Sequence, residues 1–283
     1  MIIIALCIGD RAEWALVDGK EIVEYATTYG VNPFFMSRRE ISHTIRLELP
    51  EVFFRRRWDG VYYYGSGCAN AGKNKIVEGS LVAQFRSPVE VQSDLLGVAR
   101  GILQREPGLV CLLAQGANSG FYDGRAIVKN VMSGGYILGD EGSAVNLAKN
   151  FISDVIKGIA PKSVIEDFLR TYDVTAAEII SEVYESPDNI IMALSKYSAY
   201  LEDNIQNEYC HKVVYEAFLS FFRRNVAQYD YKKYGISVAG ETVERFREVF
   251  LQAAEDFGVR VNKIDASPLM GLVDFHSSEG ENE

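Results

Sequence analysis

The stretch that decides the fold is the N-terminal segment MIIIALCIGDRAEWALVDG, residues 1–19. An apolar run over residues 2–5 leads to a break at Gly9-Asp10, and a second apolar run over 14–17 ends at Asp18-Gly19. Two apolar runs separated by a short glycine-containing break indicate a β-hairpin. The backbone N–H groups of such a hairpin can surround a phosphate group.

A second segment, LVCLLAQGANSGFYDGRAIV at 109–128, repeats this pattern and ends in a comparable Asp123-Gly124 turn. Two such hairpins indicate two related halves. Apolar runs predict further strands at 61–64, 89–91 and 236–239. Helical periodicity predicts helices over 71–83, 95–103 and 144–156, from Pro161 and from Pro187, two over 188–227, and one from Gly240 to about Phe257. Alternating strands and helices favour an α/β fold with two sheet-based lobes.

Composition excludes several classes of protein. The net charge of −10 argues against nucleic acid or an anionic membrane as a partner. The sequence predicts no metal site of its own, because the four cysteines form no CxxC pair and the three histidines are dispersed. Reduced thiols, with no signal peptide and no run of transmembrane length, predict a cytoplasmic protein.

Further motifs follow in a fixed order: GVNPF (30–34), Ser93-Asp94, LLAQGANSGFYDG (112–124), SGGYILGDEGSA (133–144), FFRRNVAQYDYKKY (221–234), GISVAG (235–240) and SPLMGLVDFH (267–276). Over nearly the whole chain they resemble the N-acetylglucosamine kinase branch of the BadF/BadG/BcrA/BcrD ATPase family, in the actin and hexokinase superfamily. The resemblance implies a two-lobed, actin-like (ribonuclease H-like) α/β fold, with an amino sugar in the cleft between the lobes. It also implies that the two hairpins hold ATP and Mg²⁺.

The same resemblance implies the domain boundaries. Residues 1–107 correspond to an N-terminal lobe, on which a C-terminal helix over 268–278 packs. Residues 108–267 correspond to a C-terminal lobe with a helical insertion, and residues 277–283 to an acidic tail. Related proteins are often dimers, so the resemblance also allows a homodimer.

Asp94 corresponds to the family's catalytic aspartate, which accepts the proton of the attacking sugar hydroxyl. An alternative interpretation is that Ser93 or Asp94 only caps the following helix. The resemblance assigns sugar binding to Asn32, Asn118, Ser119, Gly135 and Asp140. For Asn32 the alternative is an Asn-Pro turn, and for Asp140-Glu141 it is a pair of first-turn acids favoured by the helix dipole.

Nucleotide binding is assigned by the resemblance to Gly9, Asp10, Arg11, Gln115, Gly116 and Gly240. Several positions depart from the family's pattern. Leu6 replaces the carboxylate that holds Mg²⁺, Ile8 replaces a glycine, and Asp10 replaces a phosphate-binding hydroxyl. Arg11 keeps the positive charge of the family's lysine.

The second hairpin and the adenosine strand depart as well. Ala114 replaces a turn glycine, and if φ is positive there alanine costs roughly 1–2 kcal/mol. Glu241 follows Gly240 where the family has a serine, and its charge does not favour an anionic ligand.

Three functions follow as hypotheses. The first is a protein that binds an amino sugar such as N-acetylglucosamine, with weak or absent ATP-dependent phosphoryl transfer. The second is an active amino-sugar kinase whose metal site has moved to Asp10 or Glu13. The third is an interaction module that uses the two-lobed fold as a scaffold.

Overall fold

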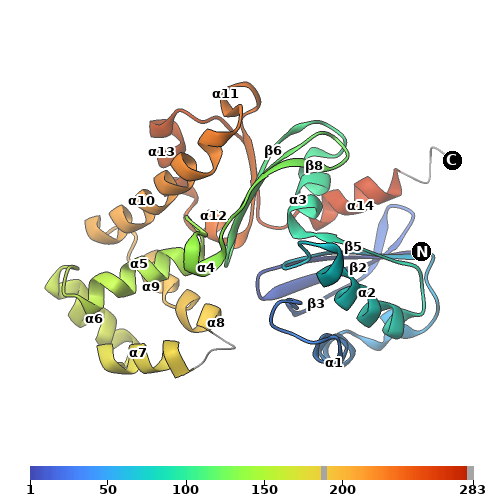
Figure 1. Cartoon of the computed structure of the whole chain (residues 1–283), viewed down its shortest axis with the longest axis horizontal. Helices are drawn as coiled ribbons and strands as arrows, with labels where there is room; N and C mark the ends of the chain where they lie inside the picture. Colours follow the sequence, from blue (N-terminus) through green and yellow to red (C-terminus); the bar gives the residue numbers. More distant parts are fainter. Residues whose placement is uncertain (186–189, 279–283) are drawn as a thin grey trace. The chain divides into compact units, whose positions relative to one another are not determined.

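The computed structural model describes residues 1–185 and 190–278. Two predictions therefore lie outside the described residues: the helix start at Pro187 and most of the acidic tail. The described chain forms two compact units (Figure 1). Unit 1 comprises Met1–Val110, Gly120–Asn130 and Asp265–Glu283, and unit 2 comprises Cys111–Ser119 and Val131–Ile264.

Strands and helices alternate along the chain, as the α/β prediction requires. The strands are β1 (Ile2–Ile8), β2 (Arg11–Asp18), β3 (Glu21–Tyr29), β4 (Gly60–Gly65), β5 (Val89–Ser93), β6 (Gly108–Leu113), β7 (Ala117–Tyr122), β8 (Ile127–Val131), β9 (Ile236–Ala239) and β10 (Val261–Asp265). The α-helices are α1 (Arg38–Glu48), α2 (Ala71–Phe85), α3 (Asp94–Leu103), α4 (Gly135–Leu138), α5 (Ala144–Ile156), α6 (Lys162–Tyr172), α7 (Ala176–Glu185), α8 (Ile190–Ser195), α9 (Ser198–Asp203), α10 (Glu208–Arg224), α11 (Tyr231–Tyr234), α12 (Glu241–Arg245), α13 (Arg247–Phe257) and α14 (Leu269–Ser277). Two 3₁₀ helices, η1 (Glu51–Phe54) and η2 (Val226–Gln228), complete the set.

The first sheet has the strand order β3-β2-β1-β4-β5. β1 pairs antiparallel with β2 and parallel with β4, so the predicted N-terminal hairpin is confirmed. Side chains alternate across β1, and Ile3, Ala5 and Cys7 join the core beneath α1 and α2. The neighbouring residue Leu6, 1% exposed, therefore belongs to the opposite face, which α3 and α14 cover.

The second sheet has the order β10-β9-β6-β7-β8. Counted from β8, this is the same order as in the first sheet counted from β3, with β6 in the place of β1. The internal duplication predicted from the two hairpins is thus confirmed at the level of strand order.

The helices of unit 2 differ from the prediction in two places. The prediction of two helices over 188–227 is wrong, because the described residues there form three α-helices, α8, α9 and α10. Asn207 is the N-cap of α10, and its side chain accepts from two backbone N–H groups. The single helix predicted after Gly240 is divided into α12 and α13 at Phe246, whose backbone leaves the helical region (φ −111°, ψ 30°). None of the helices in the described residues is long and apolar enough to cross a membrane.

Candidate functional site

The β1–β2 turn consists of Gly9 and Asp10 alone, because Ile8 pairs directly with Arg11. Gly9 has φ +62°, as a two-residue turn with glycine in the first position requires. Gly30 is pressed against this turn: its N–H donates to the Asp10 carbonyl at 2.6 Å, and a Cβ there would lie 2.4 Å from the Gly9 carbonyl oxygen. The GVNPF segment thereby fixes the three predicted nucleotide-binding residues of this hairpin.

Asp94 is connected to the same turn through Ser66. The Gly9 N–H donates to Ser66 Oγ at 3.1 Å, and the Ser66 hydroxyl donates to Asp94 Oδ2 at 2.8 Å. The Leu95 N–H donates to Asp94 Oδ1 at 2.7 Å. Burial raises the pKa of Asp94, and the hydrogen bonds from Ser66 and Leu95 oppose this effect. Ser93 caps α3, because its hydroxyl accepts from the Leu96 N–H, and this leaves the Asp94 side chain to accept from Ser66 and Leu95.

Sequence reasoning missed Ser66 as a member of this cluster. It lies directly after β4, in the Gly65-Ser66-Gly67 segment. Its hydroxyl accepts from the Gly9 N–H, and its own backbone N–H donates to the Cys7 carbonyl at 3.0 Å. The only signal was a polar residue between two glycines at the end of a buried strand.

The end of β1 does not fit a Mg²⁺ ion. Leu6 is 1% exposed, and the Cys7 thiol donates to the Val31 carbonyl at 3.6 Å. Burial raises the pKa of the Cys7 thiol. Mg²⁺ requires oxygen ligands, and the side chains of Leu6, Cys7 and Ile8 supply none. Across residues 1–185 and 190–278, no group of three or more His, Cys, Asp and Glu side chains is arranged to hold a metal ion.

The two carboxylates considered for a relocated metal differ in their surroundings. Glu13 accepts from the Tyr25 hydroxyl at 2.5 Å and also from the Ser267 hydroxyl, so both of its oxygens are engaged. Asp10 is exposed at the tip of the turn. Of the two, Asp10 is the carboxylate that remains accessible.

Asn32 forms the turn that the Asn-Pro sequence predicts. Its side-chain Oδ1 accepts from the Phe34 N–H at 2.9 Å, and its carbonyl accepts from Met36 at 2.9 Å. Asn32 also lies against Gly67, where a Cβ would come within 2.3 Å of Asn32 Oδ1. Within unit 1, Asn32 and the β1–β2 turn therefore both lie against the loop after β4, whose Ser66 donates to Asp94.

In the second hairpin, β6 and β7 are joined at Ala114, Gln115 and Gly116. Positive φ angles occur among the described non-glycine residues at Arg86, Gln104, Asp140 and Asp173. Ala114 is not among them, so the conditional penalty for alanine in a left-handed conformation does not arise. The Ala114 carbonyl accepts from the Thr242 hydroxyl at 2.7 Å and from the Ala144 N–H at 2.9 Å. These bonds fasten the hairpin to the starts of α12 and α5.

Gly240 lies directly beneath this hairpin. It has φ +114°, and a Cβ there would lie 2.2 Å from the Leu113 carbonyl oxygen. The structure thus brings together the three predicted nucleotide-binding residues of unit 2, Gln115, Gly116 and Gly240. Glu241 follows as the first residue of α12, so the segment presents a carboxylate rather than a hydroxyl.

Asp140 lies against the turn of the same hairpin. The Ala117 N–H donates to Asp140 Oδ1 at 3.3 Å, and a Cβ on Gly116 would lie 3.2 Å from Oδ2. Asp140 is 8% exposed, and burial raises its pKa to about 6. Ser143 is the N-cap of α5, so Asp140 and Glu141 precede the helix and the first-turn interpretation is wrong for both.

The remaining predicted sugar ligands of unit 2 are Asn118, Ser119 and Gly135, which precede Asp140 in the sequence. Asn118 Oδ1 accepts from the Ser119 N–H at 2.9 Å. Ser119 is 1% exposed, and its hydroxyl lies 3.1 Å from that of Tyr229, which also donates to the Ser119 carbonyl at 2.9 Å. Gly135 has φ +69°, and its carbonyl accepts from the Gly139 N–H at 2.9 Å. Sequence reasoning quoted the segment that contains Tyr229 but did not assign this residue a role.

Comparisons with known proteins place the chain by its sequence and fold. No protein-family model and no curated protein matches the sequence. A solved structure from Porphyromonas gingivalis, described as a candidate N-acetylglucosamine kinase, has 30% sequence identity and a TM-score of 0.93, with 99% of this chain and 100% of that chain covered. A second candidate N-acetylglucosamine kinase, from Chromobacterium violaceum, has 12% identity and a TM-score of 0.75 over 97% and 98% of the two chains.

A more distant structure shares the fold alone. It is a glucokinase of the ROK family from Streptomyces griseus in complex with glucose and AMPPNP, with 11% identity and a TM-score of 0.58 over 96% and 98% of the two chains. The predicted fold class is confirmed by these structures and by the two five-stranded sheets. From its identity and coverage with the Porphyromonas gingivalis protein, the chain belongs to the N-acetylglucosamine kinase-like family of proteins with an actin-like ATPase fold.

Proposed function

We propose that this sugar kinase-like protein binds an amino sugar of the N-acetylglucosamine type and has weak or absent ATP-dependent phosphoryl transfer. The observation that carries the proposal is the β1 end, where Leu6 and Cys7 are buried and the Gly9 N–H is bonded to Ser66. Phosphoryl transfer depends on positioning and on the neutralisation of phosphate charge by metal ions. Each ~1.4 kcal/mol of lost transition-state stabilisation slows a reaction about tenfold.

The nucleotide side supports the same conclusion. Arg11 supplies one positive charge beside the first turn, but Asp10 and Glu241 bring negative charges to the two segments assigned to phosphate and adenosine. The donor set at the end of β1 does not suit Mg²⁺. We therefore derive no catalytic step through ATP or Mg²⁺.

The residues proposed for the sugar have side chains that suit sugar hydroxyls. Carboxylate oxygens accept hydrogen bonds from sugar hydroxyls, and side-chain amides both donate and accept them. We propose Asp140 as the principal sugar ligand, with Asn118 beside it and Gly135 providing close backbone approach. Asn32 and Asp94, which belong to unit 1, are proposed as further sugar-binding residues, with Asp94 accepting from the hydroxyl that a kinase would phosphorylate. Ser119 is proposed to position Asn118, because its own hydroxyl is buried against Tyr229.

Calorimetry with N-acetylglucosamine, with and without Mg-ATP, tests the proposal on the full chain. We expect saturable sugar binding that Asp140→Asn weakens at least tenfold. The matched control is Asp173→Asn, since Asp173 also has a positive φ (+52°) but is exposed at the end of α6. This variant keeps the affinity of the unmodified protein.

A coupled assay of ADP release separates the alternatives. We expect no sugar-dependent release of ADP above background. Release at ordinary kinase rates that Asp94→Asn abolishes contradicts the proposal and favours an active kinase with its metal near Asp10. A complete lack of sugar binding also contradicts it and favours an interaction module.

A further inference from the structure

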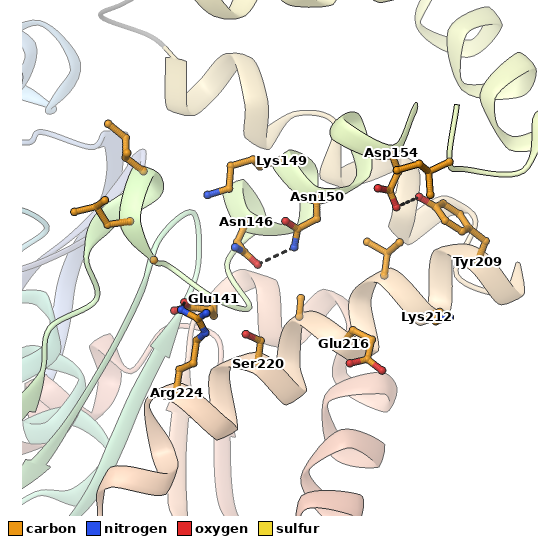
Figure 2. A pocket seen from close by; sticks show the side chains of 16 residues that line it. Glu141, Asn146, Lys149, Asn150, Asp154, Tyr209, Lys212, Glu216, Ser220 and Arg224 are labelled. Atoms are coloured by element: carbon orange, nitrogen blue, oxygen red, sulfur yellow. Dashed lines mark hydrogen bonds and ion pairs between the residues drawn. The ribbon is translucent and has the colours of Figure 1, made fainter. Parts of the chain in front are cut away.

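A groove of about 630 Å³ lies between α5 and α10 in unit 2 (Figure 2). Both walls carry polar side chains at intervals of four residues, which places each row on one face of its helix. The row on α5 consists of Asn146, Asn150 and Asp154, and the row on α10 of Lys212, Glu216, Ser220 and Arg224. None of these residues belongs to the two clusters around Asp94 and Asp140.

One wall residue has unused hydrogen-bonding capacity. Asn146 is 8% exposed, and its Oδ1 accepts from Asn150 Nδ2 at 3.3 Å. Its Nδ2 has no partner among the described residues, although it lines the groove. Because this amide faces the groove, water can accept from it in the absence of a ligand, and a ligand oxygen that accepts from Asn146 replaces that water.

The charges of the groove are balanced. Its basic residues are Lys149, Lys212 and Arg224, and its acidic residues are Glu141, Asp154 and Glu216. The cations are largely committed: Lys149 Nζ donates to the Tyr136 carbonyl at 2.8 Å, and Arg224 pairs with Glu141 at 3.1 Å. This lining disfavours a phosphate or another anion, which needs uncommitted positive charge.

The remaining groups suit a neutral ligand rich in hydroxyls. The side chains of Asn150, Ser220 and Glu216 offer an amide, a hydroxyl and a carboxylate to the same space. The Tyr209 hydroxyl is held by Asp154 at 2.8 Å, which fixes an aromatic ring at one end of the groove. We propose that this groove is a second binding site, for a neutral saccharide of about two sugar units, a size in keeping with pockets of 300–1,000 Å³.

Calorimetry tests this site. The full chain is titrated separately with N,N′-diacetylchitobiose, cellobiose and inorganic phosphate. We expect saturable binding of at least one disaccharide. Ser220→Phe fills the groove and abolishes this binding, and Asn150→Ala, at an exposed position, weakens it at least tenfold. Ser163→Phe is the matched control, because Ser163 is exposed on α6 outside the groove, and it leaves the affinity unchanged.

Four outcomes overturn the proposal: neither disaccharide binds, both groove variants keep the full affinity, phosphate binds in the groove in place of a saccharide, or Asp140→Asn abolishes disaccharide binding. The last outcome places the disaccharide in the site of the proposed function instead. The opposite result is also distinguishable. If a disaccharide binds the unmodified protein but not Ser220→Phe, and N-acetylglucosamine does not bind at Asp140, the groove proposal is supported and the proposed function is contradicted.

Discussion

The hydroxyl of Ser66 donates a hydrogen bond to Oδ2 of Asp94 at 2.8 Å. The same oxygen of Ser66 accepts from the backbone of Gly9 at 3.1 Å. A residue between two glycines thus links the tip of the first hairpin to a half-buried carboxylate on α3.

We expect Ser66→Ala to destabilise the fold by about 1–3 kcal/mol, because the Gly9 N–H loses its acceptor and Asp94 loses a donor. The pKa of Asp94, already raised by burial, rises further, since the Ser66 hydrogen bond lowers it. Urea denaturation and an NMR titration of the Asp94 carboxyl measure the two effects. Ser163→Ala, at an exposed position on α6, is the control. Equal stability of the Ser66 and Ser163 variants contradicts the prediction.

Asp140→Asn should raise stability at pH 7 while lowering sugar affinity. The folded pKa of Asp140 is raised to about 6 by burial, from an ordinary value of 3.8. The stability contributed by the protonated Asp140 carboxyl is therefore fully present below pH 3.8 and is lost as the pH rises through 6. This loss lowers the free energy of unfolding by about 3 kcal/mol. Asparagine tolerates the positive φ of 57° at this position.

Urea denaturation between pH 3.5 and 7 measures this gain, which shrinks toward zero at the acidic end. Asp173→Asn, which has a similar φ at an exposed position, shows no such gain. A stability difference that is independent of pH indicates that the carboxylate of Asp140 is not the cause.

His276 should make the fold sensitive to acid. Arg100 donates to the Tyr64 hydroxyl at 2.7 Å, and this hydroxyl lies 2.8 Å from His276 Nε2, so it donates to a neutral imidazole. Burial lowers the pKa of His276 to about 4, with smaller lowering effects from Arg100 and Arg105 and an opposing effect from Glu90. The unfolded chain binds a proton below about pH 6.5 and the folded chain does not until about pH 4.

Stability is therefore lost as the pH falls from 6.5 to 4, by about 3 kcal/mol from this residue. Urea denaturation across that range measures the slope. His276→Phe removes the titrating group and flattens the slope, whereas His211→Phe, on α10, leaves it unchanged. An equal slope in the unmodified protein and in His276→Phe contradicts the assignment.

Substitution by alanine should cost very different amounts of stability at two glycines with positive φ. A Cβ at Gly240 (φ +114°) lies 2.2 Å from the Leu113 carbonyl oxygen, whereas a Cβ at Gly258 (φ +79°) meets nothing within 4 Å. Gly258→Ala costs the backbone strain alone, about 1–2 kcal/mol. Gly240→Ala adds a backbone clash at the hairpin and costs more. Thermal unfolding of both variants compares them, and a smaller loss in Gly240→Ala contradicts the close approach.

Much of the fold was predictable from the sequence, because its strongest signals are local. The helix predicted over 144–156 coincides with α5, and the strand predicted over 236–239 coincides with β9. β3 was missed because most of its side chains are exposed or half-buried and form no apolar run. The break at Phe246 was missed since no glycine or proline marks it.

The candidate sites were predictable only where a motif carries them. Asp94 and Asp140 were predicted as site residues from the motifs Ser93-Asp94 and GDEGSA, and they remain predictions. Ser66 and Tyr229 were not, because their roles depend on hydrogen bonds to residues 28 and 110 positions away in the sequence. The groove between α5 and α10 could not be predicted for the same reason, because its two rows of polar side chains face each other only once the helices pack.

The Gly9–Ser66 hydrogen bond has a consequence for the empty molecule. In a phosphate-binding hairpin, the backbone N–H groups of the turn ordinarily have no protein acceptor and donate to a bound anion. Here Ser66 completes that bond from within, and Gly30 closes the turn from the other side. The first hairpin is thus held at its tip by hydrogen bonds within unit 1, from the Gly9 N–H to Ser66 and from the Gly30 N–H to Asp10.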